Sequence, residues 1–88
     1  MPHPPELTIL YDGGCPLCLR EVGFLRRRDG ERHRLAFVDI DAADYDPAAH
    51  GGIGYREAMG RIHALSADGE VLRDVEVFRR AYGLIGLG

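Results

Sequence analysis

The order of apolar and polar residues in the first half of the chain predicts two β-strands separated by a helix. Residues Leu7–Tyr11 (LTILY) and 35–40 (LAFVDI) are short apolar runs rich in strand-forming side chains, which is typical of buried strands. Between them, apolar residues recur at helical spacing from Pro16 to about Asp29, and Gly30 is a suitable C-terminal stop. A strand, a helix and a second strand within about 35 residues predict a right-handed βαβ unit with parallel strands.

The second half of the chain predicts a β-hairpin and a final helix. Residues 61–67 (RIHALSA) and 70–75 (EVLRDV) have the pattern of two strands joined by Asp68-Gly69, a two-residue hairpin signal. Residues Val75–Leu84 (VEVFRRAYGL) have helical periodicity, whereas residues 41–60 predict short helical turns and loops. The resulting order is β-α-β-(α)-β-β-α. We expect an α/β domain with a four-stranded mixed sheet, in which the first strand lies between the second and the third and the fourth lies at an edge.

Composition and charge narrow the class of protein. A chain of 88 residues with 45% hydrophobic and 28% charged residues fits one globular domain, here residues 7–88, preceded by a proline-rich arm at residues 1–6. The net charge of −3 gives no reason to expect a nucleic-acid partner, and no apolar stretch approaches the ~18 residues of a membrane span. Every basic residue is Arg, a bias typical of GC-rich bacterial genomes. The N-terminus shows no apolar signal core, so we expect a cytoplasmic protein.

The two cysteines, Cys15 and Cys18, stand two residues apart at the predicted start of the first helix. The turn before them ends at Gly14, and Pro16 suits the first helical position, so Cys15 falls at or beside the N-cap. A helix N-terminus offers unpaired N–H groups and about half a positive charge, and both stabilise a thiolate. Cys18 lies one turn further on the same face and is expected to be more buried. The spacing therefore predicts Cys15 as the attacking thiol and Cys18 as the resolving thiol.

The residues around the pair carry little charge that would lower a thiol pKa further. Neither Pro16 nor Leu17 is charged, so the helix terminus has to supply most of the effect, and we expect a moderate lowering of the Cys15 pKa. Asp12 acts in the opposite direction if it is close and ionised. Its carboxylate is instead placed to relay a proton to or from Cys18.

Other interpretations of the cysteine pair remain open at this point. In a cytoplasmic protein an isolated CxxC is typical of redox chemistry or metal binding rather than of a structural disulfide. A zinc site would need ligands from His33, His50 or His63, but the sequence has no second CxxC and no histidine pair at zinc-binding spacing. A pair of buried structural thiols is the third interpretation. The position of the motif at a helix start directly after a strand favours redox chemistry.

Two groups of charged residues have simpler explanations than a binding site. Arg26, Arg27 and Arg28 fall in the last turn of the predicted helix, where they complement the helix dipole rather than form a phosphate or glutathione patch. The acidic residues after the second strand lack the glycine and the terminal glutamate of a calcium loop, so we interpret them as loop and helix-start residues. They are Asp39, Asp41, Asp44 and Asp46.

Several stretches of the sequence resemble a known family. The segment YDGGCPLC (residues 11–18), followed by MGRIH (59–63), DGEV (68–71), VEVF (75–78) and GLG (86–88), resembles the DCC family of thiol-disulfide oxidoreductases, named for its D-x-x-C-x-x-C motif. The resemblance covers nearly the whole chain after the proline-rich arm. It implies a thioredoxin-like fold, in agreement with the predicted order of elements, and a bacterial redox protein.

The sequence departs from the family or fold pattern at three places. Asp74 stands where family members often have Gly, at the entry to the last helix. Thioredoxins have a cis-proline before the third strand, facing the cysteines, whereas this chain has residues 59–61 (MGR) there, and we expect that segment to lie over the cysteines. Family chains usually continue further, and the apolar end at residues 84–88 resembles a truncated chain or a buried terminus.

The predicted function is thiol–disulfide exchange with a disulfide-containing protein or a small thiol, with no metal or organic cofactor. Its predicted catalytic residues are Cys15, Cys18 and Asp12. The alternatives are a redox-sensing or partner-binding module of the same fold, which is not an enzyme, and a zinc-binding interaction domain. Bound metal would identify the latter, and turnover of a disulfide would separate the first two. The supporting candidates are Tyr11, Pro16, Arg61 and His63.

The supporting candidates differ in what they are expected to do. His63, at the start of the third strand, would stabilise a thiolate and move protons if it approached Cys15, and the resemblance places a histidine there. The alternative for His63 is a hydrogen-bonded histidine on the strand surface. Arg61 is the residue of the segment 59–61 whose charge would help a thiolate, and Tyr11 is expected to pack at the end of its strand rather than to react.

Overall fold

The computed structural model describes residues 4–86, so residues 1–3 of the expected N-terminal arm and the last two residues lie outside the description. One mixed sheet has the strand order β2-β1-β3-β4. Strand β1 pairs in parallel with β2 and antiparallel with β3, and β3 pairs antiparallel with β4. The first strand is therefore central, as the sequence predicts. The strands are β1 (Leu7–Tyr11), β2 (Leu35–Asp39), β3 (His63–Ser66) and β4 (Val71–Arg73).

Three helices complete the expected β-α-β-(α)-β-β-α order of a thioredoxin-like fold: α1 (Pro16–Asp29), α2 (Tyr55–Gly60) and α3 (Val75–Leu84). Helices α1 and α3 have the predicted bounds, whereas the last three strands are shorter than predicted. Short 3₁₀ turns at Gly30–Arg32 and Pro47–Ala49 lie in the connections. No helix within residues 4–86 is long and apolar enough to cross a membrane.

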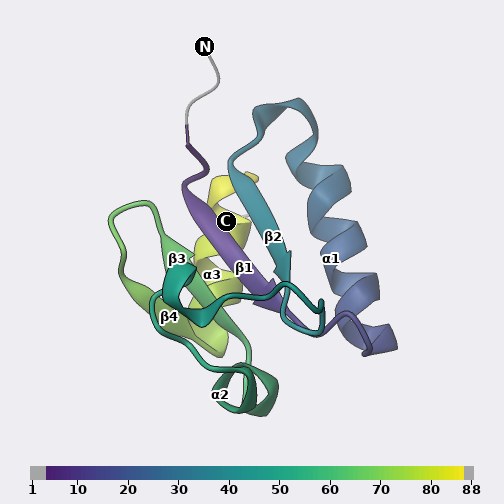
Figure 1. Ribbon diagram of the computed structural model, residues 1–88. Coiled ribbons are helices and arrows are strands. Elements are labelled where there is room, and N and C mark those ends of the chain that lie inside the picture. The colour runs from purple at the N-terminus through teal and green to yellow at the C-terminus, as the bar shows by residue number, and fades with distance from the viewer. Residues whose placement is uncertain (1–3, 87–88) are drawn as a thin grey trace.

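The sheet has a separate hydrophobic core on each face. Helices α1 and α3 pack on one face, and Figure 1 shows α2 at the bottom of the view, near the end of the sheet where β1 leads into α1. The core under α1 and α3 consists of Leu7, Ile9, Leu25, Leu35, Ala64, Leu72, Val77, Ala81 and Ile85. The smaller core under α2 consists of Leu10, Ile40, Ile53 and Ala58. Alternate residues of β1 thus serve opposite cores, as the period of a strand requires.

The end of α1 is fixed to the start of β2. The buried carboxylate of Asp29 accepts hydrogen bonds from the backbone N–H groups of Arg34 (3.1 Å) and Leu35 (3.2 Å). Gly30 ends the helix with φ 53°, ψ −126°. The Arg26 guanidinium lies over the ring of Phe37, 4.7 Å from its centroid. These contacts agree with the interpretation of the arginines as residues of a helix end.

The loop between β3 and β4 differs from the predicted two-residue turn. Ser66 pairs with Glu70 through a backbone hydrogen bond of 2.9 Å, so the loop has three residues, 67–69. Gly69 closes a turn onto the carbonyl of Ser66 (3.0 Å) and has φ 91°. A turn followed by a glycine at positive φ is the usual three-residue hairpin. Asp68-Gly69 therefore predicted the position of the hairpin correctly, whereas the predicted loop length of two residues was wrong.

The entry to α3 has the backbone conformation of a glycine. Asp74 lies at φ 55°, ψ −127°, nearly the same values as Gly30. Its side chain makes no capping hydrogen bond to α3, and its backbone N–H donates to the carbonyl of Ile62 (3.0 Å). The departure noted in the sequence, Asp where family members often have Gly, thus falls at a position where a side chain is strained.

Candidate active site

Cys15 is the N-cap of α1. Its backbone is extended, and its Sγ accepts a hydrogen bond from the backbone N–H of Cys18 at 3.3 Å. Pro16 occupies the first turn of the helix, where its missing N–H costs nothing. The backbone N–H of Cys15 donates to the carbonyl of Asp12 at 3.1 Å, which closes the turn between β1 and the helix. The sequence prediction for the position of Cys15 and Pro16 is confirmed.

The two thiols have opposite shifts in pKa. The pKa of Cys15 is lowered, first by a hydrogen bond from the Cys18 thiol and then by the backbone N–H groups of Cys18 and Leu17. The pKa of Cys18 is raised by its hydrogen bond to Cys15, by burial and by the charge of Cys15. The first proton therefore leaves Cys15. Both thiols are half-buried, so Cys18 is less enclosed than the helical pattern predicts.

The carboxylate of Asp12 acts on the site through a hydrogen bond and through its charge. Its Oδ1 accepts a hydrogen bond from the backbone N–H of Gly14 at 2.8 Å, which tightens the turn before the cysteines. Its negative charge raises the pKa of Cys15 and of Cys18, though neither effect is the largest on its thiol. The expected direction of this charge effect is confirmed, whereas its proton relay stays a prediction.

Asp39 supports the active-site turn, a role that sequence reasoning missed. Its Oδ1 accepts hydrogen bonds from the backbone N–H groups of Gly13 (2.9 Å) and Asp41 (2.8 Å). A Cβ on Gly13 would overlap the Asp39 carboxylate, so a larger residue here would displace that carboxylate from the turn. Asp39 is the register partner of Tyr11 in the parallel pair. The sequence signal for this role is weak: a polar residue at the carboxyl end of a strand predicted to lie parallel to β1.

His63 and Arg61 have partners elsewhere. The His63 side chain is fully buried, with Nδ1 2.8 Å from the carbonyl of Arg61 and Nε2 3.9 Å from a carboxylate oxygen of Glu57 in α2. His63 lies opposite Leu10 in the antiparallel pair and so belongs to the α2 face of the sheet. Arg61 forms an ion pair with Asp74 (3.5 Å). The structure does not bring either side chain to the cysteines, and the alternative of a surface histidine is wrong because His63 is buried.

The segment before β3 reaches the cysteines through Ile62. Because β3 runs antiparallel to β1, its start lies at the end of the sheet where β1 leads to Cys15, as expected. Ile62, rather than residues 59–61, lines a pocket together with Cys18, and Tyr11 belongs to the same wall. Arg61 is extended, and no peptide bond among residues 4–86 is cis.

We call this space the Cys18 pocket. It lies between α1 and α3 over β1, has a volume of about 240 Å³, and its lining is almost wholly apolar. Residues Ile9, Val22 and Leu25 form its buried floor. Its more exposed lining residues are Tyr11, Leu17, Cys18, Glu21, Ile62 and Phe78.

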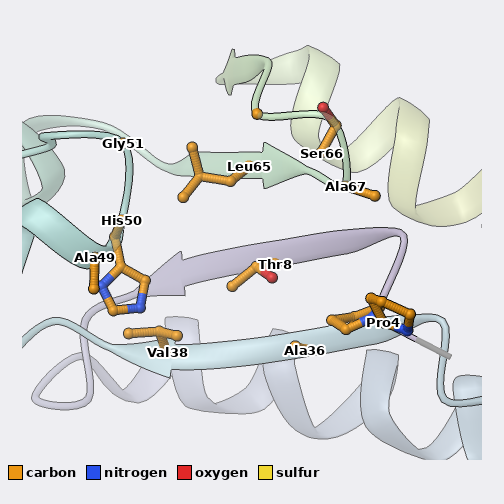
Figure 2. Close-up of a pocket in the computed structure, with 12 residues that line it drawn as sticks. Pro4, Thr8, Ala36, Val38, Ala49, His50, Gly51, Leu65, Ser66 and Ala67 are labelled. Carbon is orange, nitrogen blue, oxygen red and sulfur yellow. The ribbon is translucent and has the colours of Figure 1, made fainter. Parts of the chain in front are cut away.

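A pocket larger than the Cys18 pocket lies on the other face of the sheet. It has a volume of about 540 Å³, and Figure 2 shows His50 beside Val38 at one end and Pro4 at the other, with Thr8 between them. The His50 ring is held by the carbonyl of Asp46 (2.8 Å) and stacks on Tyr45. This pocket contains neither cysteine.

The arrangement of histidines bears on the zinc alternative. His33 is an exposed residue with φ 53° after α1, His50 lies in the pocket of Figure 2, and His63 is buried under α2. Within the part of the chain that the structure describes, no group of three or more His, Cys, Asp or Glu side chains is placed to hold a metal ion.

Comparison with known proteins agrees with this geometry. An uncharacterized, chloroplastic protein of Arabidopsis thaliana is 47% identical over 83 residues, which is 94% of this chain and 39% of the plant protein. This chain thus spans well under half of that relative. No solved structure matches the chain. The model of the DCC1-like thiol-disulfide oxidoreductases matches residues 9–88, and the chain therefore belongs to that family.

Proposed function

We propose that this protein is a thiol–disulfide oxidoreductase in which Cys15 is the nucleophile and Cys18 the resolving thiol. The observation that carries the proposal is the position of Cys15 as the N-cap of α1, with Sγ accepting the N–H of Cys18. The Cys18 thiol also donates a hydrogen bond to the Cys15 sulfur. This bond and the backbone N–H groups lower the pKa of Cys15, whereas the thiol–thiol hydrogen bond raises the pKa of Cys18.

The proposed reaction transfers two electrons from the reduced protein to a substrate disulfide. The Cys15 thiolate attacks one substrate sulfur, a mixed disulfide forms as the substrate S–S bond breaks, and the departing thiolate takes a proton from water. Cys18 then loses its proton and attacks the Cys15 sulfur. This step forms the Cys15–Cys18 disulfide and releases the second substrate thiol. An external thiol reductant returns the protein to its dithiol form.

The surrounding residues hold the nucleophile in place in this proposal. Asp39 fixes Gly13, and Asp12 fixes Gly14, so the turn delivers Cys15 to the helix end. We assign to Asp12 the transfer of the proton to and from Cys18, and its place in the turn that leads into the cysteines supports this, since its carbonyl accepts the backbone N–H of Cys15 at 3.1 Å. Thiol exchange of this kind needs no metal or organic cofactor. The bacterial origin and the cytoplasmic location stay predictions.

The experiment that tests this function compares turnover by two variants. The native protein is expected to reduce a peptide disulfide repeatedly when dithiothreitol is supplied. Cys15→Ser is expected to abolish the reaction, whereas Cys18→Ser is expected to attack once and remain as a mixed disulfide that mass spectrometry detects. Oxidation of the native protein without turnover would instead indicate a redox-sensing module. Zinc bound to the purified protein would indicate the metal-binding alternative.

A further inference from the structure

The Cys18 pocket has the resolving thiol in its lining and is large enough for a side chain. Its volume of about 240 Å³ exceeds the ~150 Å³ of an apolar cavity that holds a benzene molecule. A leucine or phenylalanine side chain therefore fits.

The wall of the pocket is exposed although it is apolar. Leu17 is 73% exposed, and it stands between the two cysteines. Ile62 and Phe78, which come from the segment before β3 and from α3, are half-buried. Exposed apolar groups that gather around a reactive centre mark a surface that a partner covers. The Cys15 Sγ accepts a hydrogen bond from the backbone N–H of Cys18 at 3.3 Å, so a group joined to Cys15 starts beside a residue that lines the pocket.

The charge around the pocket distinguishes glutathione disulfide from disulfides of peptides or proteins. Among residues 4–86, Glu21 is the one charged residue that lines the pocket, and its carboxylate accepts a hydrogen bond from the Tyr82 hydroxyl at 2.9 Å. None of the described lining residues is a cation, and the negative charge of Asp12 raises the pKa of both thiols. Glutathione disulfide has more carboxylates than ammonium groups and is therefore an anion. The negative charges of Glu21 and Asp12 repel it. An uncharged apolar side chain avoids that repulsion and gains from burial.

We propose that the Cys18 pocket binds an apolar side chain adjacent to the cystine of a peptide or protein substrate, and that the enzyme prefers such disulfides to glutathione disulfide. This inference rests on the proposed function. The pocket makes no covalent bond. It holds the substrate while Cys15 attacks and keeps the mixed disulfide beside Cys18 until the second exchange, so the preference appears in the rate of reduction at low substrate concentration.

The test uses single-turnover reduction of self-quenched peptide disulfides by the reduced full chain. Two peptides differ only at the residue next to the cysteine, which is Leu in one and Gly in the other, and glutathione disulfide is the third substrate. We expect the Leu peptide to react at least about tenfold faster than the Gly peptide at low concentration, since most of a leucine side chain is buried. Glutathione disulfide is expected to react more slowly than either peptide.

Variants connect the preference to the pocket. Leu17→Ser and Phe78→Ala are each expected to reduce the Leu-to-Gly rate ratio to about threefold or less, because each removes one wall of the pocket. The matched control is Leu19→Ser, at a residue of the same type on the same helix that is 48% exposed and does not line the pocket. It should leave all three rates unchanged. Circular dichroism verifies that each variant is folded.

The outcomes separate this inference from the proposed function. Equal rates for the two peptides, or a ratio that neither Leu17→Ser nor Phe78→Ala lowers, overturn the pocket assignment while the enzyme stands. A ratio that Leu19→Ser lowers as much as Leu17→Ser also overturns it. Failure to reduce any of the three disulfides overturns the proposed function and the inference with it.

Discussion

Replacing Asp74 with glycine should stabilise the protein, because its backbone conformation suits glycine and strains other residues. Asp74 has φ 55°, ψ −127°, the values of the first central residue of a type II′ turn. The same conformation occurs at Gly30, with φ 53°, ψ −126°. The chain thus contains one such position occupied by glycine and one occupied by a residue with a side chain. The two positions allow opposite substitutions to be compared in one fold.

The expected gain follows from three contributions. A side chain at a sparsely populated backbone conformation costs about 1–3 kcal/mol, which glycine removes. Glycine also increases the entropy of the unfolded chain, at a cost of about 0.4–1 kcal/mol. The ion pair with Arg61 is lost, but its N–O distance is 3.5 Å and both side chains are about half exposed. Such a pair contributes only about a few tenths of a kcal/mol. The net gain is about 1 kcal/mol, or about 4–8 °C in Tm for a domain of this size.

Urea and thermal unfolding of the reduced protein, followed by circular dichroism, measure this gain. Asp74→Ala is the first control, because it removes the ion pair and keeps the strain, and it should be slightly less stable than the native protein. Gly30→Ala is the second control. A Cβ at Gly30 meets no atom within 4 Å, so its expected loss of about 1 kcal/mol reports the backbone strain, less the gain from the lower entropy of the unfolded chain, with no steric overlap. The reasoning is refuted if Asp74→Gly is no more stable than Asp74→Ala.

Three further predictions concern the site and its supports. Gly13→Ala would push a methyl group into the Asp39 carboxylate, so the free energy of unfolding should fall by about 1–3 kcal/mol and Cys15 should be alkylated more slowly. The control is Gly83→Ala, whose added methyl group meets open space and which should show neither effect. Asp12→Asn keeps an oxygen for Gly14 and removes a charge that raises the Cys15 pKa, so the thiolate absorbance should appear at lower pH, and an unchanged midpoint would contradict this role. Tyr82→Phe deletes the hydrogen bond to Glu21 that joins α3 to α1 and should cost about 0.5–1.5 kcal/mol in urea unfolding; stability equal to that of the native protein would show that this bond contributes nothing.

Local signals predicted the elements that local physics determines. Helix α1 has a capping cysteine, a proline in its first turn and a glycine stop, and its bounds follow from these residues. The apolar run of β1 and the periodicity of α3 likewise mark buried elements from the pattern of their own residues. The position of Cys15 at the helix end was readable for the same reason.

Features that depend on pairing between distant segments were not readable. The face on which His63 lies is set by its register with Leu10, which no local pattern encodes, and that register buries its ring under α2. The role of Asp39 depends on the parallel pairing of β2 with β1, which brings its carboxylate to Gly13. Ile62 lines the Cys18 pocket because the start of β3 lies beside the end of β1. In each case the sequence predicted which strands are neighbours but not the register that brings these side chains together.

The central claim, that Cys15 attacks and Cys18 resolves, is tested most directly by alkylation of the reduced protein with iodoacetamide across pH. Trypsin leaves both thiols in the peptide of residues 1–20, and its fragment ions locate each adduct. A lowered pKa means that the thiolate persists to lower pH, so Cys15 should be labelled first, with a midpoint below that of an ordinary thiol. Cys18, with its raised pKa, should be labelled slowly and only at higher pH. Equal labelling of the two thiols, or faster labelling of Cys18, would contradict the assignment.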